Sequence, residues 1–414
     1  MTATRPIAAY TAVTAAYWAF MLTDGALRML VLLHFHTLGF TPVQLAYLFL
    51  LYEFMGMVTN LSAGWIAARF GLTSTLYAGL ALQVAALVAL AQLDPEWAIG
   101  VSVAFVMVVQ GASGVAKDLA KMSSKSAVKL LAPEEDGGLF RWVAWLTGSK
   151  NAVKGLGFLA GATLLGLIGF EASVLAMAAA LTVILAAVAI AMPPGLPGGL
   201  KGVKFSTVLS KDRQVNTLAA ARVFLFGARD TWFVVGIPIF FYAVLSDGTT
   251  EGNRAAFFLI GTFMAFWIIG YGAVQAAAPR LIDARNKPVP ELAGLAGGWV
   301  LALAFVPILL AGIAFIGGRE AWVVVAMVAG LLVFGGIFAV NSALHSYLIL
   351  AFSRHERVTQ DVGFYYMANA AGRLLGTLLS GLSYQIGGLP LCLATAAVMA
   401  GASWFFARRL SPAG

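Results

Sequence analysis

The sequence predicts an all-α membrane protein with twelve transmembrane helices, arranged as two pseudo-symmetric six-helix bundles. The first observation is composition: 61% of the residues are hydrophobic and only 11% are charged, whereas about 25% are charged in ordinary soluble domains. The second is a series of apolar stretches that are each long enough to cross about 30 Å of hydrocarbon. The third is the uneven distribution of Lys and Arg between alternate connecting segments. Together these observations exclude a soluble globular protein.

The apolar stretches give the helices in chain order. We expect spans near residues 7–36, 42–68, 72–93, 96–121, 138–169, 171–192, 213–245, 254–278, 290–316, 320–350, 361–387 and 390–407. Short segments with Gly or Pro, such as "LGFTP" and "GGLP", separate several of them. The longest break is rich in Pro, Gly and Lys, as cytoplasmic linkers are. We therefore predict an N-terminal bundle at 1–192, a cytoplasmic linker at 193–212 and a C-terminal bundle at 213–414.

Basic residues predict the orientation of these spans. If the N-terminus is cytoplasmic, the inner segments hold sixteen Lys and Arg residues, and the outer loops hold only Arg254 and Arg319. Cytoplasmic loops carry an excess of Lys and Arg. We therefore expect both termini in the cytoplasm.

The two halves carry repeated motifs. The segments "NAVKG…LIGF", from Asn151, and "NAAGR…QIGG", from Asn369, keep a single offset of 218 residues. The segments "LTDGALR" in span one and "FGARD" in span seven place charges at similar depth. Two six-helix repeats joined by a basic linker are typical of transporters whose halves rock around a site at the midplane.

Charges inside the predicted spans are the main functional signal. Each costs roughly 2.5–3.5 kcal/mol at a helix centre, so it should be paired or line a polar cavity. The basic ones are Arg28, Lys117, Lys121, Lys150, Lys154, Arg222, Arg229 and Arg373, and the acidic ones are Asp24, Glu53, Asp118 and Asp230. Eight cations against four carboxylates leave a surplus of about four positive charges. Such an interior indicates a polyanionic ligand.

Spacing suggests partners for some of these charges. Asp24 and Arg28 are separated by four residues, so they either form a fixed salt bridge on one helix face or leave Arg28 to the ligand. Lys150 and Lys154 have the same spacing but the same sign, and both lie deep in span five. We expect this pair to contact an anion, the alternative being a structural pairing, for instance with Glu53.

The C-terminal half carries arginines, whose planar guanidinium suits bidentate contact with phosphate or arsenate. Arg229 and Asp230 are about 100° apart on a helix, which predicts that they have different partners. Arg222 lies nearer the cytoplasm, where snorkelling to the headgroups and a functional role are both open. Arg373, four residues after Asn369 in span eleven, matches the position of Lys154 with Asn151 in span five.

The segment "GVAKDLAKMSSKSAVK" spaces four lysines at every fourth residue. We expect Lys125 and Lys129 to lie at the headgroups, beyond the hydrocarbon. Lys117 should face the cavity, with Lys121 at its cytoplasmic mouth and Asp118 tying the helix to a neighbour.

Span ten has Asn341 and His345 at the positions of the two deeper lysines in span four. His345 is either a proton relay, since histidine titrates near neutral pH, or a satisfied polar residue. The single cysteine, Cys392, and four scattered histidines offer no metal-ligand spacing. We therefore expect no metal, no cofactor and no enzymatic activity.

Long blocks of the sequence resemble the organoarsenical efflux permease family, ArsJ-type, of the major facilitator superfamily. They are "LTDGALRMLVLLHFHTLGFTP" (22–42), "YEFMGMVTNLSAGW" (52–65), "GVAKDLAKMSSKSAVKLLAPE" (114–134), "LTGSKNAVKGLGF" (146–158) and "FLFGARDTWFVVGIP" (224–238). The resemblance implies export of 1-arseno-3-phosphoglycerate across a bacterial inner membrane, which confers arsenate resistance. It also implies a functional partner, a glyceraldehyde-3-phosphate dehydrogenase that makes this ester, and we expect the permease itself to be a monomer.

The segment "GWIAARFGLT" departs from the general superfamily loop, G-x-x-x-[DE]-R-x-G-x-[RK]. Ala68 stands where the loop has an acid and Thr73 where it has a base. The usual charge latch of the N-terminal half is therefore not expected here.

These observations give one set of candidate site residues. We predict substrate contacts from Arg28, Lys117, Lys121, Lys150, Asn151, Lys154, Arg229, Asn341, Asn369 and Arg373, and coupling or gating roles for Asp24, Glu53, Asp118, Asp230 and His345. The energy source is either the membrane voltage or proton antiport. The functional alternatives are an organophosphate exchanger, an exporter of other organic anions, and an intramembrane enzyme or sensor.

Overall fold

The computed structural model describes residues 4–131, 138–192, 210, 212–284, 286–353 and 358–410, and every element in this part of the chain is an α-helix. The helices are α1 (Thr4–Thr37), α2 (Pro42–Leu90), α3 (Ile99–Leu131), α4 (Gly138–Ile168), α5 (Phe170–Ala191), α6 (Arg213–Phe233), α7 (Gly236–Leu245), α8 (Thr250–Leu281), α9 (Val289–Gly317), α10 (Ala321–Phe352) and α11 (Val358–Ala407). The predicted linker falls almost wholly outside the described residues, as do the side chains of Lys125 and Lys129.

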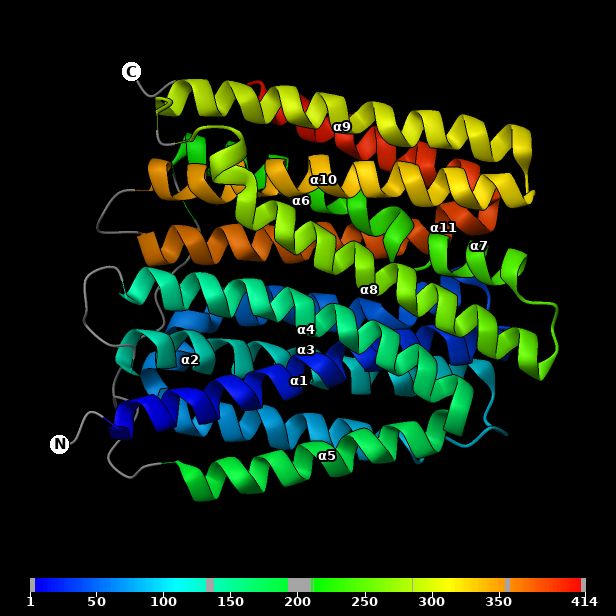
Figure 1. The fold of residues 1–414 in the computed structure, drawn as a ribbon, viewed down its shortest axis with the longest axis horizontal. Coiled ribbons are helices and arrows are strands. Elements are labelled where there is room, and N and C mark those ends of the chain that lie inside the picture. The colour runs from blue at the N-terminus through cyan, green and yellow to red at the C-terminus, as the bar shows by residue number, and fades with distance from the viewer. Residues whose placement is uncertain are drawn as a thin grey trace.

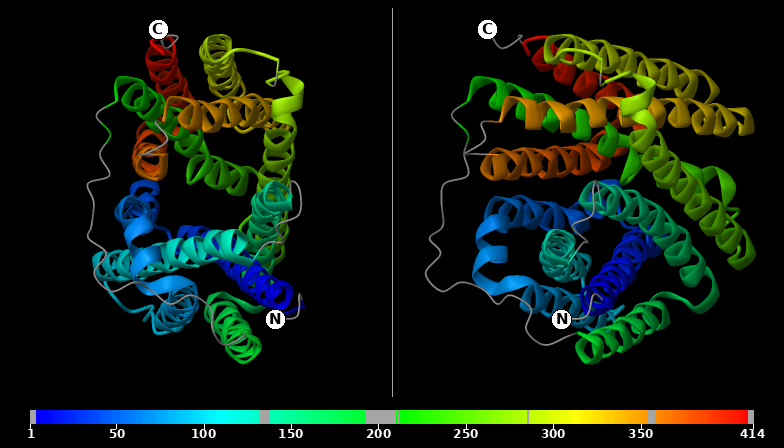
Figure 2. Two further views of the ribbon diagram at one scale, coloured as in Figure 1. Left: turned by 90° about the vertical axis from the view of Figure 1, so that its left-hand side faces the viewer. Right: turned by 60° about the vertical axis from the view of Figure 1, so that its left-hand side comes forward.

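Helices α1–α5 lie together on one side of the molecule and α6–α11 on the other (Figures 1 and 2). The two groups meet where α2 packs against α11 and α4 packs against α8. Both chain ends lie at the same end of the helices (Figure 1), as an even number of spans requires. The predicted all-helical membrane fold is confirmed.

Two of the helices are long enough to cross a membrane twice. Helix α2 turns at Gly71, which has a φ of 74°, and α11 turns at Gly387 and Gly388, the latter with a φ of 62°. Only glycine adopts a positive φ without a steric cost from Cβ. Among the described residues, eleven segments meet the length and hydropathy of a span, and the last of them contains the α11 turn. The expected total of twelve spans follows.

Span seven is interrupted, whereas the sequence predicts one continuous helix over 213–245. The chain leaves α6 after Phe233 and resumes as α7 at Gly236. Pro238 in the first turn of α7 has no amide hydrogen, which favours a helix start. The Ser380 hydroxyl on α11 accepts hydrogen bonds from the amides of Val235 and Gly236, each at 3.2 Å. A helix break at membrane depth is tolerated where protein groups satisfy the freed amides in this way.

Glycines bring the helices that carry the site close together. A Cβ at Gly25 in α1 would lie 2.5 Å from the Lys154 carbonyl oxygen in α4, and one at Gly157 would overlap the Leu22 carbonyl oxygen. In the other half, a Cβ at Gly376 in α11 would lie 2.7 Å from the Gly227 carbonyl oxygen in α6. Small residues permit such close backbone approach between membrane helices.

Large apolar side chains cover the outer surface. On α9, Phe315 is 80% exposed and Ile316 is 83% exposed. Charged residues of the spans are instead buried between helices, among them Glu53 and Asp118. A soluble protein has the opposite distribution of apolar and charged side chains, so this surface fits a surrounding lipid bilayer.

Candidate functional site

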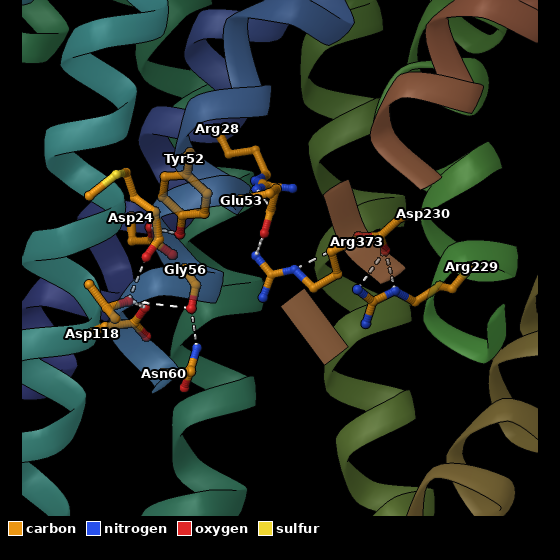
Figure 3. A network of polar contacts seen from close by, with 12 residues as sticks. Asp24, Arg28, Tyr52, Glu53, Gly56, Asn60, Asp118, Arg229, Asp230 and Arg373 are labelled. Atoms are coloured by element: carbon orange, nitrogen blue, oxygen red, sulfur yellow. Dashed lines mark hydrogen bonds and ion pairs between the residues drawn. The ribbon is translucent and has the colours of Figure 1, made fainter. Parts of the chain in front are cut away.

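A chain of alternating charges crosses from one group of helices to the other (Figure 3). Glu53 on α2 is fully buried and lies 2.6 Å from Nη2 of Arg28 on α1. Nη2 of Arg373 on α11 lies at the same distance from both Glu53 carboxylate oxygens. Glu53 therefore holds one arginine from each side of the molecule.

The chain continues through Asp230 on α6. Its Oδ1 accepts a hydrogen bond of 2.5 Å from Nε of Arg229, and its Oδ2 lies 3.9 Å from Nε of Arg373. The expectation of different partners for Arg229 and Asp230 is therefore wrong. Adjacent side chains on a helix diverge at Cβ, but the long arginine side chain bends back to reach its neighbour.

Asp24 on α1 forms a second cluster with α2 and α4. Its Oδ2 lies 2.7 Å from Nζ of Lys154, and its Oδ1 accepts a hydrogen bond of 2.5 Å from the Tyr52 hydroxyl. The i,i+4 pairing of Asp24 with Arg28 is not formed, because the close packing of α1 on α4 places Lys154 nearer. The alternative pairing of Lys154 with Glu53 is not formed either.

The two acid–base pairs occupy corresponding spans. Asp24 and Lys154 lie on spans one and five, while Asp230 and Arg373 lie on spans seven and eleven. In both halves, the glycine contacts described above bring the two helices together.

Asp118 on α3 ties that helix to α2, as the sequence analysis expects. Its Oδ2 accepts a hydrogen bond of 2.5 Å from the Thr59 hydroxyl. Lys121 lies 3.4 Å from Oδ1 of Asp118 and donates to Oδ1 of Asn60 at 2.9 Å. The positive charge of Lys121 is thus balanced by Asp118, a carboxylate on the same helix.

Lys117 has a different environment from the other interior lysine of α3. Its Nζ lies 4.2 Å from the centre of the Tyr52 ring, an arrangement typical of a cation–π contact. It also lies close to Gly56, where an added Cβ would be 3.9 Å away. Lys117 is 8% exposed and has no carboxylate within 4.0 Å in the part of the chain that the structure describes.

Arg222 on α6 is the second interior cation without a carboxylate among the described residues. Its Nε donates to Oδ1 of Asn369 at 3.2 Å, and its Nη1 donates to the carbonyl and hydroxyl oxygens of Ser342. Its guanidinium lies over the rings of Phe226, at 4.1 Å, and Tyr365, at 4.7 Å. All its hydrogen-bond acceptors are neutral.

Three other predicted site residues lie outside these contacts. The amide of Asn341 on α10 donates to the Ala296 carbonyl on α9 at 3.1 Å. His345, also on α10, is fully buried. Asn151 on α4 packs against Gly272 of α8. Lys150, the residue before Asn151 on α4, is half-buried.

The structure thus divides seven of the eight interior cations, all except Lys150, into two groups. Five lie within 4.0 Å of a carboxylate: Arg28, Lys121, Lys154, Arg229 and Arg373. Each of the four interior carboxylates has at least one of these partners. Lys117 and Arg222 have no carboxylate within 4.0 Å among the described residues. From the sequence alone the role of Arg222 is open, and Tyr52, Ser342 and Thr59 are not predicted, because their partners are distant in sequence.

Neither a protein-family model nor a curated protein matches this sequence. The fold, however, is similar to solved structures of transporters. A POT family transporter in complex with 5-aminolevulinic acid superposes with a TM-score of 0.71 at 14% identity, covering 97% of this chain and 95% of that one. A POT family transporter in complex with a thioalcohol-conjugated peptide superposes with a TM-score of 0.69 at 14% identity, covering 95% of this chain and 94% of that one. The nucleoside transporter NupG superposes with a TM-score of 0.69 at 16% identity, covering 97% of this chain and 98% of that one.

At these identities the similarity establishes the fold and not the ligand. It extends over nearly the full length of each chain. The protein is a multi-pass membrane protein with the same twelve-helix fold as these transporter structures.

Proposed function

We propose that the protein is a secondary transporter that exports 1-arseno-3-phosphoglycerate from the cytosol by alternating access, and so confers arsenate resistance. The observation that carries this proposal is Lys117, a buried ammonium group in an interior whose four carboxylates are all engaged by other cations. An uncompensated buried charge is costly. A ligand that brings negative charge to Lys117 would remove that cost.

The chemistry of the ester fits the interior. A phosphate ester carries about −1.5 to −2 charges at neutral pH, and an arsenate ester should be similar, so the molecule is roughly a tri- to tetra-anion. The surplus of about four positive charges among the spans is what such an anion would neutralise. The single cysteine argues against arsenite, because trivalent arsenic prefers clusters of thiolates.

The choice of this particular polyanion rests on the resemblance of the sequence blocks to the organoarsenical permeases. In this proposal a glyceraldehyde-3-phosphate dehydrogenase supplies the ester, and breakdown outside the cell completes detoxification. The permease is a monomer of the bacterial inner membrane with both termini in the cytoplasm, where the basic residues are concentrated. It carries out no chemistry on its ligand.

The contacts suggest a division of roles. Lys117 meets one anionic group of the ligand. The partly exposed cations beside it, Lys121, Lys154 and Arg373, contribute to the positive field while remaining bound to carboxylates. Glu53 and Asp230 couple the two groups of helices through Arg373, and Asp24 and Asp118 hold Lys154 and Lys121 in place.

Voltage alone can drive this export. One charge moving through 100 mV is worth about 2.3 kcal/mol. Expelling three negative charges from a cell that is negative inside would therefore gain roughly 7 kcal/mol per 100 mV. Proton antiport through the interior carboxylates is the alternative, and all four are already engaged with cations.

Arsenate resistance tests the proposal in cells. An arsenate-sensitive strain expressing the protein with the partner dehydrogenase should grow in arsenate, while the protein alone should give little protection. Equal resistance without the dehydrogenase would refute the organoarsenical assignment. It would favour a transporter of another organic anion, such as an organophosphate exchanger.

A further inference from the structure

Arg222 is held as an anion receptor would be held, and not as a structural ion pair. Its guanidinium is fixed on two sides by Asn369 and Ser342 and is covered by the rings of Phe226 and Tyr365. Nη2 donates to no residue that the structure describes. The side chain is 4% exposed, so the geometry is set before any ligand arrives.

Neutral acceptors orient a cation without cancelling its charge. The other two interior arginines of the C-terminal half, Arg229 and Arg373, both have carboxylate partners. A buried guanidinium without one bears a desolvation cost that hydrogen bonds to neutral groups repay only in part. An oxyanion at the remaining donors would form charge-assisted hydrogen bonds, the strong class for arginine.

Two lines of contact join Arg222 to the Lys117 region. Asn369, which binds Arg222, is followed by Ala370, and a Cβ at Gly56 would lie 3.8 Å from Ala370 and 3.9 Å from Nζ of Lys117. Tyr365, beneath Arg222, packs on Tyr366 with ring centres 5.7 Å apart, and Lys121 lies 5.1 Å from the Tyr366 ring. The two cations are thus on opposite groups of helices, and residues of α11 contact the surroundings of both.

We propose that Arg222, oriented by Asn369 and Ser342, is a second anion-binding subsite, which takes one oxyanion group of a ligand whose other oxyanion group lies at Lys117. This inference rests on the proposed function and adds a specificity for anions that are charged at both ends. A ligand with one charged end would fill only one of the two subsites.

Binding of two stable probes to the purified full-length protein tests this. 1,3-Propanediol bisphosphate has a phosphate at each end of three carbons, and glycerol 3-phosphate has only one. One charge-assisted contact is worth about tenfold or more in affinity. We therefore expect wild type to bind the bisphosphate at least about tenfold more tightly, as measured by calorimetry.

Two variants should remove this preference. Arg222→Gln deletes the charge, and Asn369→Asp leaves the arginine in place but gives it a carboxylate. For both, we expect the ratio of the two dissociation constants to approach one. Arg213→Gln, an exposed arginine on the same helix, should keep the wild-type ratio. Melting temperature and gel filtration show whether each variant is folded. If Arg222→Gln is not folded, the ratio of dissociation constants for Asn369→Asp tests the subsite.

A preserved preference in folded Asn369→Asp or Arg222→Gln would overturn the subsite, as would wild type that binds both probes equally. These results differ from failure of the proposed function. If the bisphosphate preference holds and depends on Arg222, but membrane vesicles do not transport the arsenylated acid, the subsite stands and the substrate assignment is wrong.

Discussion

Lys117 and Lys121 lie one helical turn apart on α3, yet their surroundings in the structure differ. Lys121 is bound by Asp118 and Asn60, whereas Lys117 lies on the Tyr52 ring without a carboxylate. A cation–π contact contributes less than an ion pair when both are buried, so the ammonium of Lys117 retains more of its capacity to attract an anion. The residue-level prediction follows from this difference.

Lys117→Gln should lower the rate of export by about tenfold or more, the loss expected when one charge-assisted contact is removed. The measurement is initial uptake into inside-out vesicles, normalised to the amount of protein. Lys287→Gln is the control, because Lys287 pairs with Glu291 at the surface. Equal losses in both variants at matched expression would contradict the role of Lys117.

Glu53→Gln tests the charge chain at its centre. Glu53 binds Arg28 and Arg373, and both arginines would lose their main acceptor in the variant. Removing one partner of a buried ion pair typically costs about 3–5 kcal/mol. We expect a lower melting temperature in detergent and reduced export. An unchanged melting temperature would show that the carboxylate does not stabilise this state.

At the scale of helices, glycines decide which charges meet. The contact of α1 with α4 depends on Gly25 and Gly157, and it places Asp24 beside Lys154. On the other side, α6 and α11 approach through Gly227 and Gly376. Side chains at these positions would separate the helices that carry the ion pairs.

Gly157→Ala should therefore destabilise the protein by about 1–3 kcal/mol, the usual cost of overpacking, because its Cβ would overlap the Leu22 carbonyl oxygen. Gly312→Ala on α9 is the matched control, since no described atom lies within 4 Å of its added Cβ. It should be neutral or slightly stabilising. Thermal unfolding of both variants in the same detergent gives the comparison, and equal effects would refute the close-packing argument.

Sequence reasoning recovers the spans because apolar length is a local property, and the glycine-containing turns within α2 and α11 fall where the pattern ends. It misses the break at Val234 and Val235, because the partner that satisfies the freed amides, Ser380, is distant in sequence. The partners of the interior charges are predicted wrongly for the same reason. Spacing favours Asp24 with Arg28, but the folded chain brings Lys154 from another helix.

Lys117 is a different case. Its position, deeper in the membrane than Lys125 and Lys129, follows from counting residues along the span. That no described carboxylate lies within 4.0 Å of it follows only from the placement of the other interior charges. The role proposed for Arg222 likewise depends on contacts with Ser342 and Asn369, which are distant in sequence.

At the scale of the whole molecule, the two groups of helices are joined by contacts that the proposed alternating access would have to break or rearrange. Glu53 and Arg373 form one such contact. Another lies near the start of α2, where the Val43 amide donates to Oε1 of Gln385 at 3.1 Å. A transporter whose halves rock against each other cannot keep both contacts fixed throughout its cycle.

Val43→Cys with Gln385→Cys should form a disulfide that holds this contact closed. With Cys392→Ser as background, these would be the only two thiols in the chain. Oxidation should stop export, and a reductant should restore it, while each single-cysteine variant should be insensitive. Full export by the cross-linked protein would show that this contact need not open.

Uptake into inside-out vesicles tests most directly whether this interior carries a three-carbon acid that is charged at both ends out of the cell. The vesicles would be given arsenate, 3-phosphoglycerate, or the arsenylated acid generated in place by the dehydrogenase, with voltage held and the pH gradient collapsed. We expect concentrative uptake of the arsenylated acid that depends on Lys117. Uptake of arsenate alone, or none of the arsenylated acid by folded wild-type protein, would contradict it.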